Sequence, residues 1–336
     1  MRRRTLLSLS LASMLSGVSP RSLAQGQGAL VMMGTEVPEI MAGLAQALGQ
    51  GAEGTGLALE YRQARPAQII SRLSSQAEAD AMPHLVLLPT PDLAVQLANE
   101  GYTLPQSLPG GQNAPHWRNE VFAVAHDAAV FVTHGGRIPA EEAPRSRTEL
   151  ARMLERNRPR FQGRVGLVNI GIDNVAYGYA AQDSLRSALF WRISGAFGMA
   201  QARIFDTPEE LLAALSRGII DFGYNVPLSV ARRAAAEHTE IGIIIPQDYV
   251  LALPLTALVP VHAGLPGGLV SSELVSLLFS APAQQALGAM GLTPIGARSG
   301  IENLQTIELG PELLVFLDPL KRSRFLDTWF QQVVQN

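Results

Sequence analysis

The chain contains no cysteine, and its 6 histidines do not fall at the spacing of a metal site. Without thiols it has no disulfides and no thiolate metal centres. The motifs G-x-S-x-G, G-x-x-x-x-G-K and H-E-x-x-H, which mark serine nucleophiles, phosphate loops and zinc sites, are absent as well. Nothing in the sequence requires an enzyme, so we expect no catalytic activity, no cofactor and no resident metal.

Two further ligand classes, dinucleotides and nucleic acids, are not predicted. Residues 49–54 match G-x-G-x-x-G, but they follow a predicted helix and precede a predicted strand, the reverse of the order in a dinucleotide-binding loop. We therefore interpret them as a helix end and a loop. The balance of 26 basic against 29 acidic residues, with no basic block after the N-terminus, lacks the positive surplus that phosphate backbones attract.

Residues 1–24 have the pattern of a secretory signal peptide. Arg2 to Arg4 provide a charged start, Leu6 to Val18 form an apolar run too short to span a membrane, and Ser22 to Ala24 offer a small-x-small cleavage site. The arginines also partly match a twin-arginine export signal, which leaves the export route open. We expect a periplasmic protein whose mature chain begins near Gln25.

Short apolar strands alternate with amphipathic helices after this segment, a rhythm typical of parallel sheets with crossover helices. About 310 residues remain, more than one hydrophobic core usually serves. The predicted fold class is therefore α/β, with two Rossmann-like lobes. Strands are expected at residues 29–33, 56–61, 84–88, 165–168, 202–205, 219–224 and 241–245.

Two extended segments, residues 120–133 and 247–260, connect the two series of strands and helices. Two such crossings allow a hinge between the lobes. The expected limits are residues 25–127 plus 251–300 for lobe 1, 128–250 for lobe 2 and 301–336 for a C-terminal helical tail.

The segment at residues 163–183 holds a short apolar strand, a loop of small and polar residues, and the start of a long helix expected to continue through Phe197. Asp173 or Asn174 is the expected N-cap of this helix. The free amides near residues 173–176, together with the positive end of the helix dipole, suit an anion. An ordinary strand-to-helix crossover has the same pattern.

Ligands of such folds bind at the carboxyl ends of the strands, where the lobes face each other. Polar residues follow several of the predicted strands at these ends. For Thr90 and Thr207, which precede prolines, helix capping alone is the alternative interpretation. The residues expected to bind the ligand are Thr35, Glu36, Gln63, Thr90, Asp127, Asn169, Asp173, Asn174, Tyr224 and Asn225.

Four segments carry a resemblance to a known family: HLVLLPTPDLA at residues 84–94, WRNEVFAV at 117–124, YNV at 224–226 and PQDY at 246–249. With the signal peptide and the two α/β lobes, they resemble the periplasmic solute-binding proteins of ABC transporters, over essentially the whole mature chain. Within that class the chain is similar to the ferric-iron-type branch, which also includes sugar-phosphate binders and phosphoglycerate-sensing proteins.

The resemblance implies a monomeric, type II-like protein that captures a small anionic solute, phosphorylated or carboxylated, for an ABC permease. The alternatives are a ferric-iron transport protein, a ligand-sensing subunit for a membrane histidine kinase, and a secreted hydrolase. In the iron-binding members two adjacent tyrosines follow the strand that corresponds to residues 219–224. Here the pair is Tyr224-Asn225, and replacing a phenolate by an amide removes negative charge from a site for a hard ferric ion.

Overall fold

The computed structural model describes residues 29–52, 58–75, 82–108, 114–261, 263–264 and 271–334. The predicted signal peptide, residues 1–24, lies outside these ranges. No helix within them is both long and apolar enough to cross a lipid bilayer.

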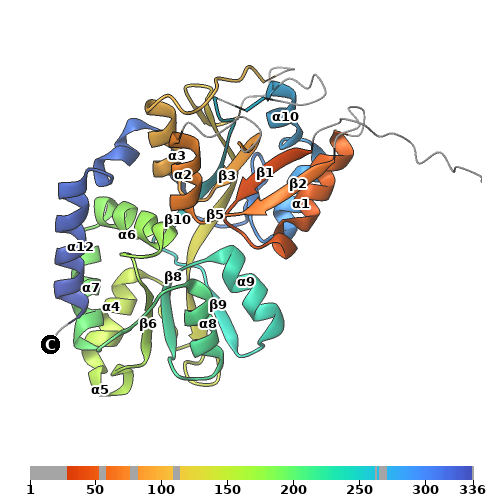
Figure 1. Ribbon diagram of the computed structural model, residues 1–336. Helices are drawn as coiled ribbons and strands as arrows, with labels where there is room; N and C mark the ends of the chain where they lie inside the picture. Colours follow the sequence, from red (N-terminus) through yellow and green to blue (C-terminus); the bar gives the residue numbers. More distant parts are fainter. Residues whose placement is uncertain are drawn as a thin grey trace, which may run out of the picture.

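The chain forms two lobes whose strands join in one mixed sheet, with the strand order β2-β1-β3-β10-β5-β8-β6-β7 (Figure 1). Lobe 1 contains β1 (Leu30–Gly34), α1 (Pro38–Gly51), β2 (Leu59–Gln63), α2 (Pro66–Ser74), β3 (Leu85–Leu88), α3 (Pro91–Asn99), β4 (His116–Trp117), β10 (Val250–Leu258), α10 (Ser271–Leu277), α11 (Ala281–Ala289), β11 (Thr293–Pro294) and β12 (Leu304–Thr306). Lobe 2 contains α4 (Arg147–Arg156), α5 (Arg158–Phe161), β6 (Val165–Val168), α6 (Asn174–Arg186), α7 (Leu189–Met199), β7 (Arg203–Phe205), α8 (Pro208–Ser216), β8 (Phe222–Pro227), α9 (Leu228–Glu237) and β9 (Ile241–Ile244). β5 (Val121–His134) runs between the lobes. The chain ends with η5 (Pro311–Phe316) and α12 (Pro319–Val333).

Parallel pairing dominates each lobe away from the centre of the sheet. β1 pairs in parallel with both β2 and β3, and β6 pairs in parallel with β7 and β8. Parallel neighbours need a crossover connection, which α1, α2 and the lobe 2 helices provide. The predicted α/β class is confirmed.

β5 carries the chain from one lobe to the other (Figure 1). Residues 121–128 pair with β10 in lobe 1, and residues 129–134 pair with β8 and β9 in lobe 2. The sequence indicated two extended pieces separated at His126-Asp127, whereas the structure has one strand of 14 residues. The return crossing leads from β9 into β10, so both extended connections expected for a hinge are present.

The C-terminal segment forms a third connection between the lobes. η5 packs on α3 in lobe 1, and α12 packs on α7 in lobe 2, along one edge of the molecule (Figure 1). Asp318 caps α12, because its Oδ1 accepts hydrogen bonds from the amides of Leu320 and Lys321. The buried residues Phe325 and Trp329 join the largest core cluster of lobe 2, so this segment is part of the fold rather than an appended tail.

The prediction of one long helix from residue 174 through Phe197 is wrong in one respect. The structure has two helices there, α6 and α7. Ser187 has an extended backbone, and its Oγ accepts a hydrogen bond of 3.1 Å from the amide of Leu189. The serine thus competes with helix continuation. Ile193 and Phe197 of α7 are buried in the same hydrophobic core as the apolar residues of α6. For this reason the helical spacing of apolar residues continues in the sequence across the break.

Candidate functional site

A cleft with a volume of about 540 Å³ lies between the lobes. Its wall is built from the ends of β1 and β3 in lobe 1, the middle of β5, and the ends of β6, β7 and β8 in lobe 2. Most of its lining is apolar, and the cleft falls within the size range of sites for small organic molecules. Apolar lining residues come from both lobes: Met41, Leu87, Leu253, Leu255, Met290 and Leu292 on one side, and Val168, Ile172, Val175 and Val230 on the other.

Most of the residues predicted to bind a ligand lie on this wall. They are Thr35, Glu36, Thr90, Asp127, Asp173, Asn174 and Asn225. The structure thereby brings together residues that are far apart in the sequence, because strand ends from both lobes face the same space. Their role toward a ligand remains a prediction.

Gln63 and Asn169 lie outside the wall. Gln63 is exposed, and its Nε2 donates to the carbonyl of Thr35 at 3.3 Å. Asn169 uses its side chain inside its own loop, where Oδ1 accepts from the amide of Gly171 at 3.0 Å and Nδ2 donates to Asp206 at 3.4 Å. Both side chains shape neighbouring backbone instead of facing the cleft.

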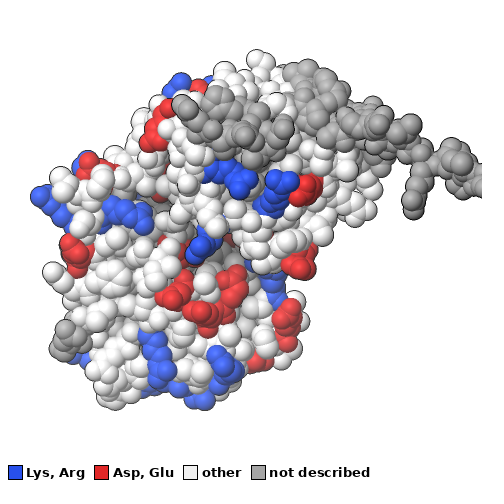
Figure 2. All heavy atoms as spheres, in the orientation of Figure 1, with Lys and Arg blue, Asp and Glu red and all other residues white. Residues whose placement is uncertain are grey.

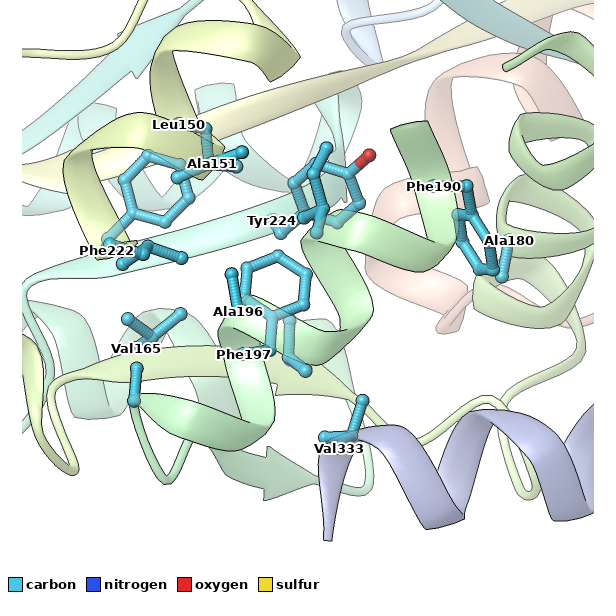
Figure 3. Packing of buried hydrophobic residues seen from close by; sticks show 14 of the residues in the cluster. Leu150, Ala151, Val165, Ala180, Phe190, Ala196, Phe197, Phe222, Tyr224 and Val333 are labelled. Carbon is cyan, nitrogen blue, oxygen red and sulfur yellow. The ribbon is translucent and has the colours of Figure 1, made fainter. Parts of the chain in front are cut away.

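Tyr224 points away from the cleft into the core of lobe 2. Side chains alternate along a strand, so Phe222 and Tyr224 of β8 share the core face (Figure 3). The Tyr224 ring stacks on Phe131, with 5.3 Å between ring centroids and 26° between planes. Its hydroxyl donates to Asp183 at 2.5 Å. The expectation that Tyr224 lines the ligand site is therefore not supported.

Ferric iron is expected to produce no phenolate-to-iron charge-transfer colour when added to the purified protein. Tyr224 is buried and its hydroxyl is already bound by Asp183 and by Nε of Arg147, at 3.1 Å. Within the described residues, no group of three or more acidic or histidine side chains is arranged to hold a metal ion. A titration followed by visible absorbance tests this. A stoichiometric coloured complex that disappears in Tyr224→Phe would contradict it.

Arg147 is the centre of a buried ionic network in lobe 2 that the sequence did not reveal. The side chains of Arg147 and Asp183 are both fully buried, with 3.1 Å between Nε and Oδ1. The hydroxyls of Tyr224 and Tyr249 both donate to the Asp183 carboxylate. Arg147 Nη1 also donates to Asp248 at 3.2 Å and to the carbonyl of Tyr249 at 2.8 Å.

This network connects four elements: the N-terminus of α4, the last turn of α6, the middle of β8 and the crossing into β10. Burial is the main cause that raises the pKa of Tyr224 and that of Tyr249, and the Asp183 carboxylate raises both pKa values further. The phenols therefore stay protonated and act as donors. The network fixes the return crossing, at Asp248 and Tyr249, to lobe 2.

Asn225 extends from this network to the cleft. It lies within β8, two residues before the end of the strand, with φ 50°, a left-handed conformation that asparagine tolerates better than most residues. Its Nδ2 donates to Asp183 at 3.0 Å, while its Oδ1 is buried and has no hydrogen-bond partner among the described residues. The side chain is only 8% exposed, so this acceptor is oriented but unused.

Thr90 presents a second unused polar atom, from the opposite lobe. Its side chain is 1% exposed, and its Oγ1 has no partner among the described residues. Thr90 does not cap α3, whereas Thr207 caps α8 by accepting from the amide of Glu210 at 3.1 Å. The capping interpretation is therefore right for Thr207 and wrong for Thr90. A buried polar atom without a partner is costly, which makes both Thr90 and Asn225 candidates for contact with a ligand.

The amides at the start of α6 are already used by the protein. Asp173 is the N-cap, as predicted, and its Oδ1 accepts from the amide of Ala176 at 2.7 Å. Its carboxylate thus occupies the positive end of the helix dipole. The amide of Ala176 is therefore engaged by Asp173, and the negative charge of this carboxylate disfavours the anion site predicted there.

Carboxylates outnumber guanidinium groups on the cleft wall. Acidic residues gather where the face of the molecule is hollowed between the lobes (Figure 2). The acidic lining residues are Glu36, Asp127, Asp173, Asp206 and Glu209, and the basic ones are Arg65 and Arg233. Sequence reasoning missed Glu209, Ser229 and Arg233, and it placed Asp206 and Arg65 at strand ends without counting them as ligand contacts, since nothing local distinguishes them from surface charges.

Besides Asp173, two of these carboxylates have partners on the cleft wall. Asp127 accepts from the amide of Ser229 at 3.0 Å and from its hydroxyl at 2.5 Å, at the first turn of α9. Glu36 in lobe 1 forms an ion pair of 3.7 Å with Arg233 in lobe 2. The remaining basic residue, Arg65, is exposed at the start of α2.

Desolvation raises the pKa of three carboxyls in the cleft, those of Glu36, Asp127 and Asp173. The charge of Glu209 raises the pKa of Glu36 and that of Asp173 further. Arg233 opposes this at Glu36 and Asp127, where it lowers the pKa. Glu36 of lobe 1 and Glu209 of lobe 2 therefore repel each other, while Arg233 of lobe 2 attracts Glu36 more strongly.

No protein-family model matches the chain, and no curated protein does. Solved structures do match. The substrate-binding protein of an ABC transporter from Agrobacterium tumefaciens has a TM-score of 0.80 at 24% identity, over 93% of this chain and 95% of that chain. Iron-bound HitA from Pseudomonas aeruginosa has a TM-score of 0.66 at 15% identity, over 91% and 99%. AfuA from Actinobacillus pleuropneumoniae, with fructose-6-phosphate bound, has 0.67 at 13%, over 93% and 100%.

The chain therefore has the fold of the type II periplasmic binding proteins, in agreement with the predicted architecture. The similar structures include the substrate-binding protein of an ABC transporter and the periplasmic binding protein AfuA, and two of them hold a ligand, iron in HitA and fructose-6-phosphate in AfuA. At these identities the likeness establishes the fold. The branch within the class and the ligand remain predictions from the residues.

Proposed function

We propose that this protein is the substrate-binding component of an ABC transporter and captures a small organic solute in the cleft between its lobes. One observation carries the proposal: two buried polar atoms without partners, Thr90 Oγ1 in lobe 1 and Asn225 Oδ1 in lobe 2, border a cleft of about 540 Å³. A solute that bonds to both atoms would satisfy both lobes at once.

Binding to both lobes favours closure of the cleft, because neither lobe alone completes the site. Ile172 supports this, since its side chain lines the cleft and is 61% exposed. Closure over a solute would remove this apolar surface from water. Small-angle scattering of the free and the solute-bound protein tests the proposal, with a smaller radius of gyration expected for the bound form.

Export is the second part of the proposal, and it rests on the signal-like pattern of residues 1–24. N-terminal sequencing of the protein recovered from the periplasm is expected to give a first residue at or near Gln25. Retention of an intact chain beginning at Met1 in the membrane fraction would contradict it.

Replacing Thr90 with valine or Asn225 with glycine is expected to weaken solute binding about tenfold to a hundredfold, since a hydrogen bond to a charged ligand contributes about 1.5–3 kcal/mol. Valine keeps the volume of Thr90, and glycine tolerates the left-handed backbone of residue 225. Calorimetry with the solute identified by native mass spectrometry of the purified protein measures the change.

Gln63→Ala is the matched control for these two variants. Gln63 is a polar residue at a strand end that the structure places outside the cleft, so its truncation is expected to leave the affinity unchanged. Equal losses in all three variants would indicate a general loss of folded protein. Full affinity in both Thr90→Val and Asn225→Gly would overturn the cleft assignment.

A further inference from the structure

We propose that the ligand of this cleft carries a primary or secondary ammonium group, held between carboxylates of the two lobes. This inference rests on the binding function proposed above and adds the charge and chemical class of the solute. It replaces the anionic solute that the sequence and the family resemblance led us to expect.

The distribution of charge is the first observation. Acidic residues lie on the cleft wall in β5, in α8, directly after β1 and β7, and in the loop before α6, on both sides of the space. Arg233 is already paired with Glu36, and Arg65 is exposed at the rim. The lining therefore carries more carboxylates than guanidinium groups, so a positive group entering the cleft meets a net negative charge, whereas an anion meets repulsion.

The unused acceptor of Asn225 is the second, independent observation. Its Nδ2 is committed to Asp183, which fixes the orientation of the amide, and its Oδ1 has no partner among the described residues although Asn225 lies on the lining of the cleft. The atom is an acceptor only, so its partner must donate a hydrogen bond. An ammonium N–H supplies that donor together with the charge that the carboxylates favour.

A bare metal ion fits the cleft less well than an organic cation. Among the residues described, no three acidic or histidine side chains converge as metal ligands. The apolar wall and the volume of about 540 Å³ instead accommodate a carbon skeleton.

A quaternary ammonium group is disfavoured as well. Recognition of quaternary ammonium depends on several aromatic faces, and Tyr179 is the one aromatic residue found on the described lining. The hydroxyl of Tyr179 donates to the carbonyl of Asp127 at 3.0 Å, which fixes its ring in the core between the lobes. A quaternary group would also leave Asn225 Oδ1 without a donor.

An ammonium group also accounts for closure. Glu36 and Glu209 lie on opposite lobes and repel each other, and this repulsion grows as the lobes approach. A cation between them replaces that repulsion with two attractions. The same solute would therefore bind and close the cleft.

Acidification is expected to weaken binding. In the free cleft the pKa values of Glu36, Asp127 and Asp173 are raised, and a bound cation favours their ionised forms. Affinity is thus full where these groups are ionised and falls as the pH decreases from neutral through their raised pKa values. The other charged groups facing the cleft are Asp206, Glu209, Arg65 and Arg233, and no histidine is among the described lining residues. An anionic ligand would show the opposite trend.

The test is a thermal-shift and calorimetry panel on the purified mature protein. Butylamine, putrescine and γ-aminobutyrate carry the proposed group, while butanol, butyrate, tetramethylammonium and fructose-6-phosphate are the matched compounds without it. We expect stabilisation by at least one of the amines, with affinity that falls on acidification, and none by the matched compounds.

Two charge-neutralising variants refine the test. Glu36→Gln and Glu209→Gln are each expected to reduce the affinity for the amine about tenfold, the effect of removing one carboxylate at a partly exposed site. Glu39→Gln is the control, since Glu39 is an exposed glutamate of lobe 1 outside the lining. An equal loss in Glu39→Gln would attribute the effect to overall charge and overturn the assignment.

The remaining outcomes separate the two proposals. If butyrate or the sugar phosphate binds and no amine does, the charge inference is overturned and the binding function stands. If no compound of either charge produces a shift, both are overturned.

Discussion

Replacing Arg147 with methionine is expected to destabilise the folded protein by about 3–5 kcal/mol, the usual cost of removing one partner from a buried ion pair. The side chains of Arg147 and Asp183 have no exposed surface. Methionine fills much of the volume but leaves the Asp183 charge buried without its cation. Tyr224, Tyr249 and Asn225 still donate to this carboxylate and retain part of its stabilisation.

The loss is expected to extend to the hinge. Arg147 holds the return crossing through Asp248 at 3.2 Å and through the carbonyl of Tyr249 at 2.8 Å. Without these bonds the crossing is attached to lobe 2 by fewer contacts, so amide hydrogen exchange near residues 248–250 should accelerate along with the fall in overall stability. Urea denaturation and hydrogen exchange measure the two effects separately.

Arg192→Met is the matched control. Arg192 also forms a two-pronged ion pair, with Glu155 at 2.7 and 2.8 Å, but its side chain is half exposed. Surface pairs of this kind contribute at most about 1 kcal/mol. Equal losses in the two variants would show that burial does not determine the contribution of Arg147, and the proposed role of the network would fail.

The reason why the sequence did not reveal this network is the separation of its members. Arg147 lies 36 residues from Asp183, 77 from Tyr224 and 101 from Asp248. It is one of many arginines and stands in a polar segment at a helix start, where exposed arginines are common. Periodicity reports which face of an element is buried, but it carries no signal for a charged residue that is buried by its partners.

The strand ends were easier to predict, because alternation of strands and helices implies a parallel sheet, and a parallel sheet places these ends on one side. This reasoning located Thr35, Thr90 and Asn225 on the cleft wall. It could not decide between the adjacent residues Tyr224 and Asn225. The phase of a strand at its last residues depends on its register and on a positive φ at residue 225, neither of which appears in the sequence.

The charge of the site was the least predictable feature. A helix N-terminus after a strand can bind either an anionic ligand or a carboxylate of the chain itself. In this structure the carboxylate of Asp173 caps the helix. The acidic excess arises from residues such as Asp206 and Glu209, which acquire a shared environment only when β7, α8 and the loop before α6 meet lobe 1. Composition averages over the whole surface and does not record such a cluster.

Replacing Phe325 with alanine is expected to destabilise the protein by about 3–5 kcal/mol, as for other large-to-small changes at buried aromatic sites. Phe325 lies in α12 and is 7% exposed. Its ring contacts Phe190 in a stacked arrangement with 5.9 Å between centroids, and Tyr177 and Trp191 at 5.8 and 5.5 Å in edge-on arrangements. Alanine would leave a cavity among three aromatic rings.

Leu320→Ala in the same helix is the matched control, because Leu320 is 71% exposed and alanine is an equally good helix former. Its effect should stay within about 0.5 kcal/mol. If Phe325→Ala does not accumulate as folded protein, Phe325→Leu provides a milder change with an expected loss of about 1–2 kcal/mol. Urea denaturation gives the free energies of unfolding. Equal stabilities of the Phe325 and Leu320 variants would mean that α12 is a dispensable tail, contrary to its place in the lobe 2 core.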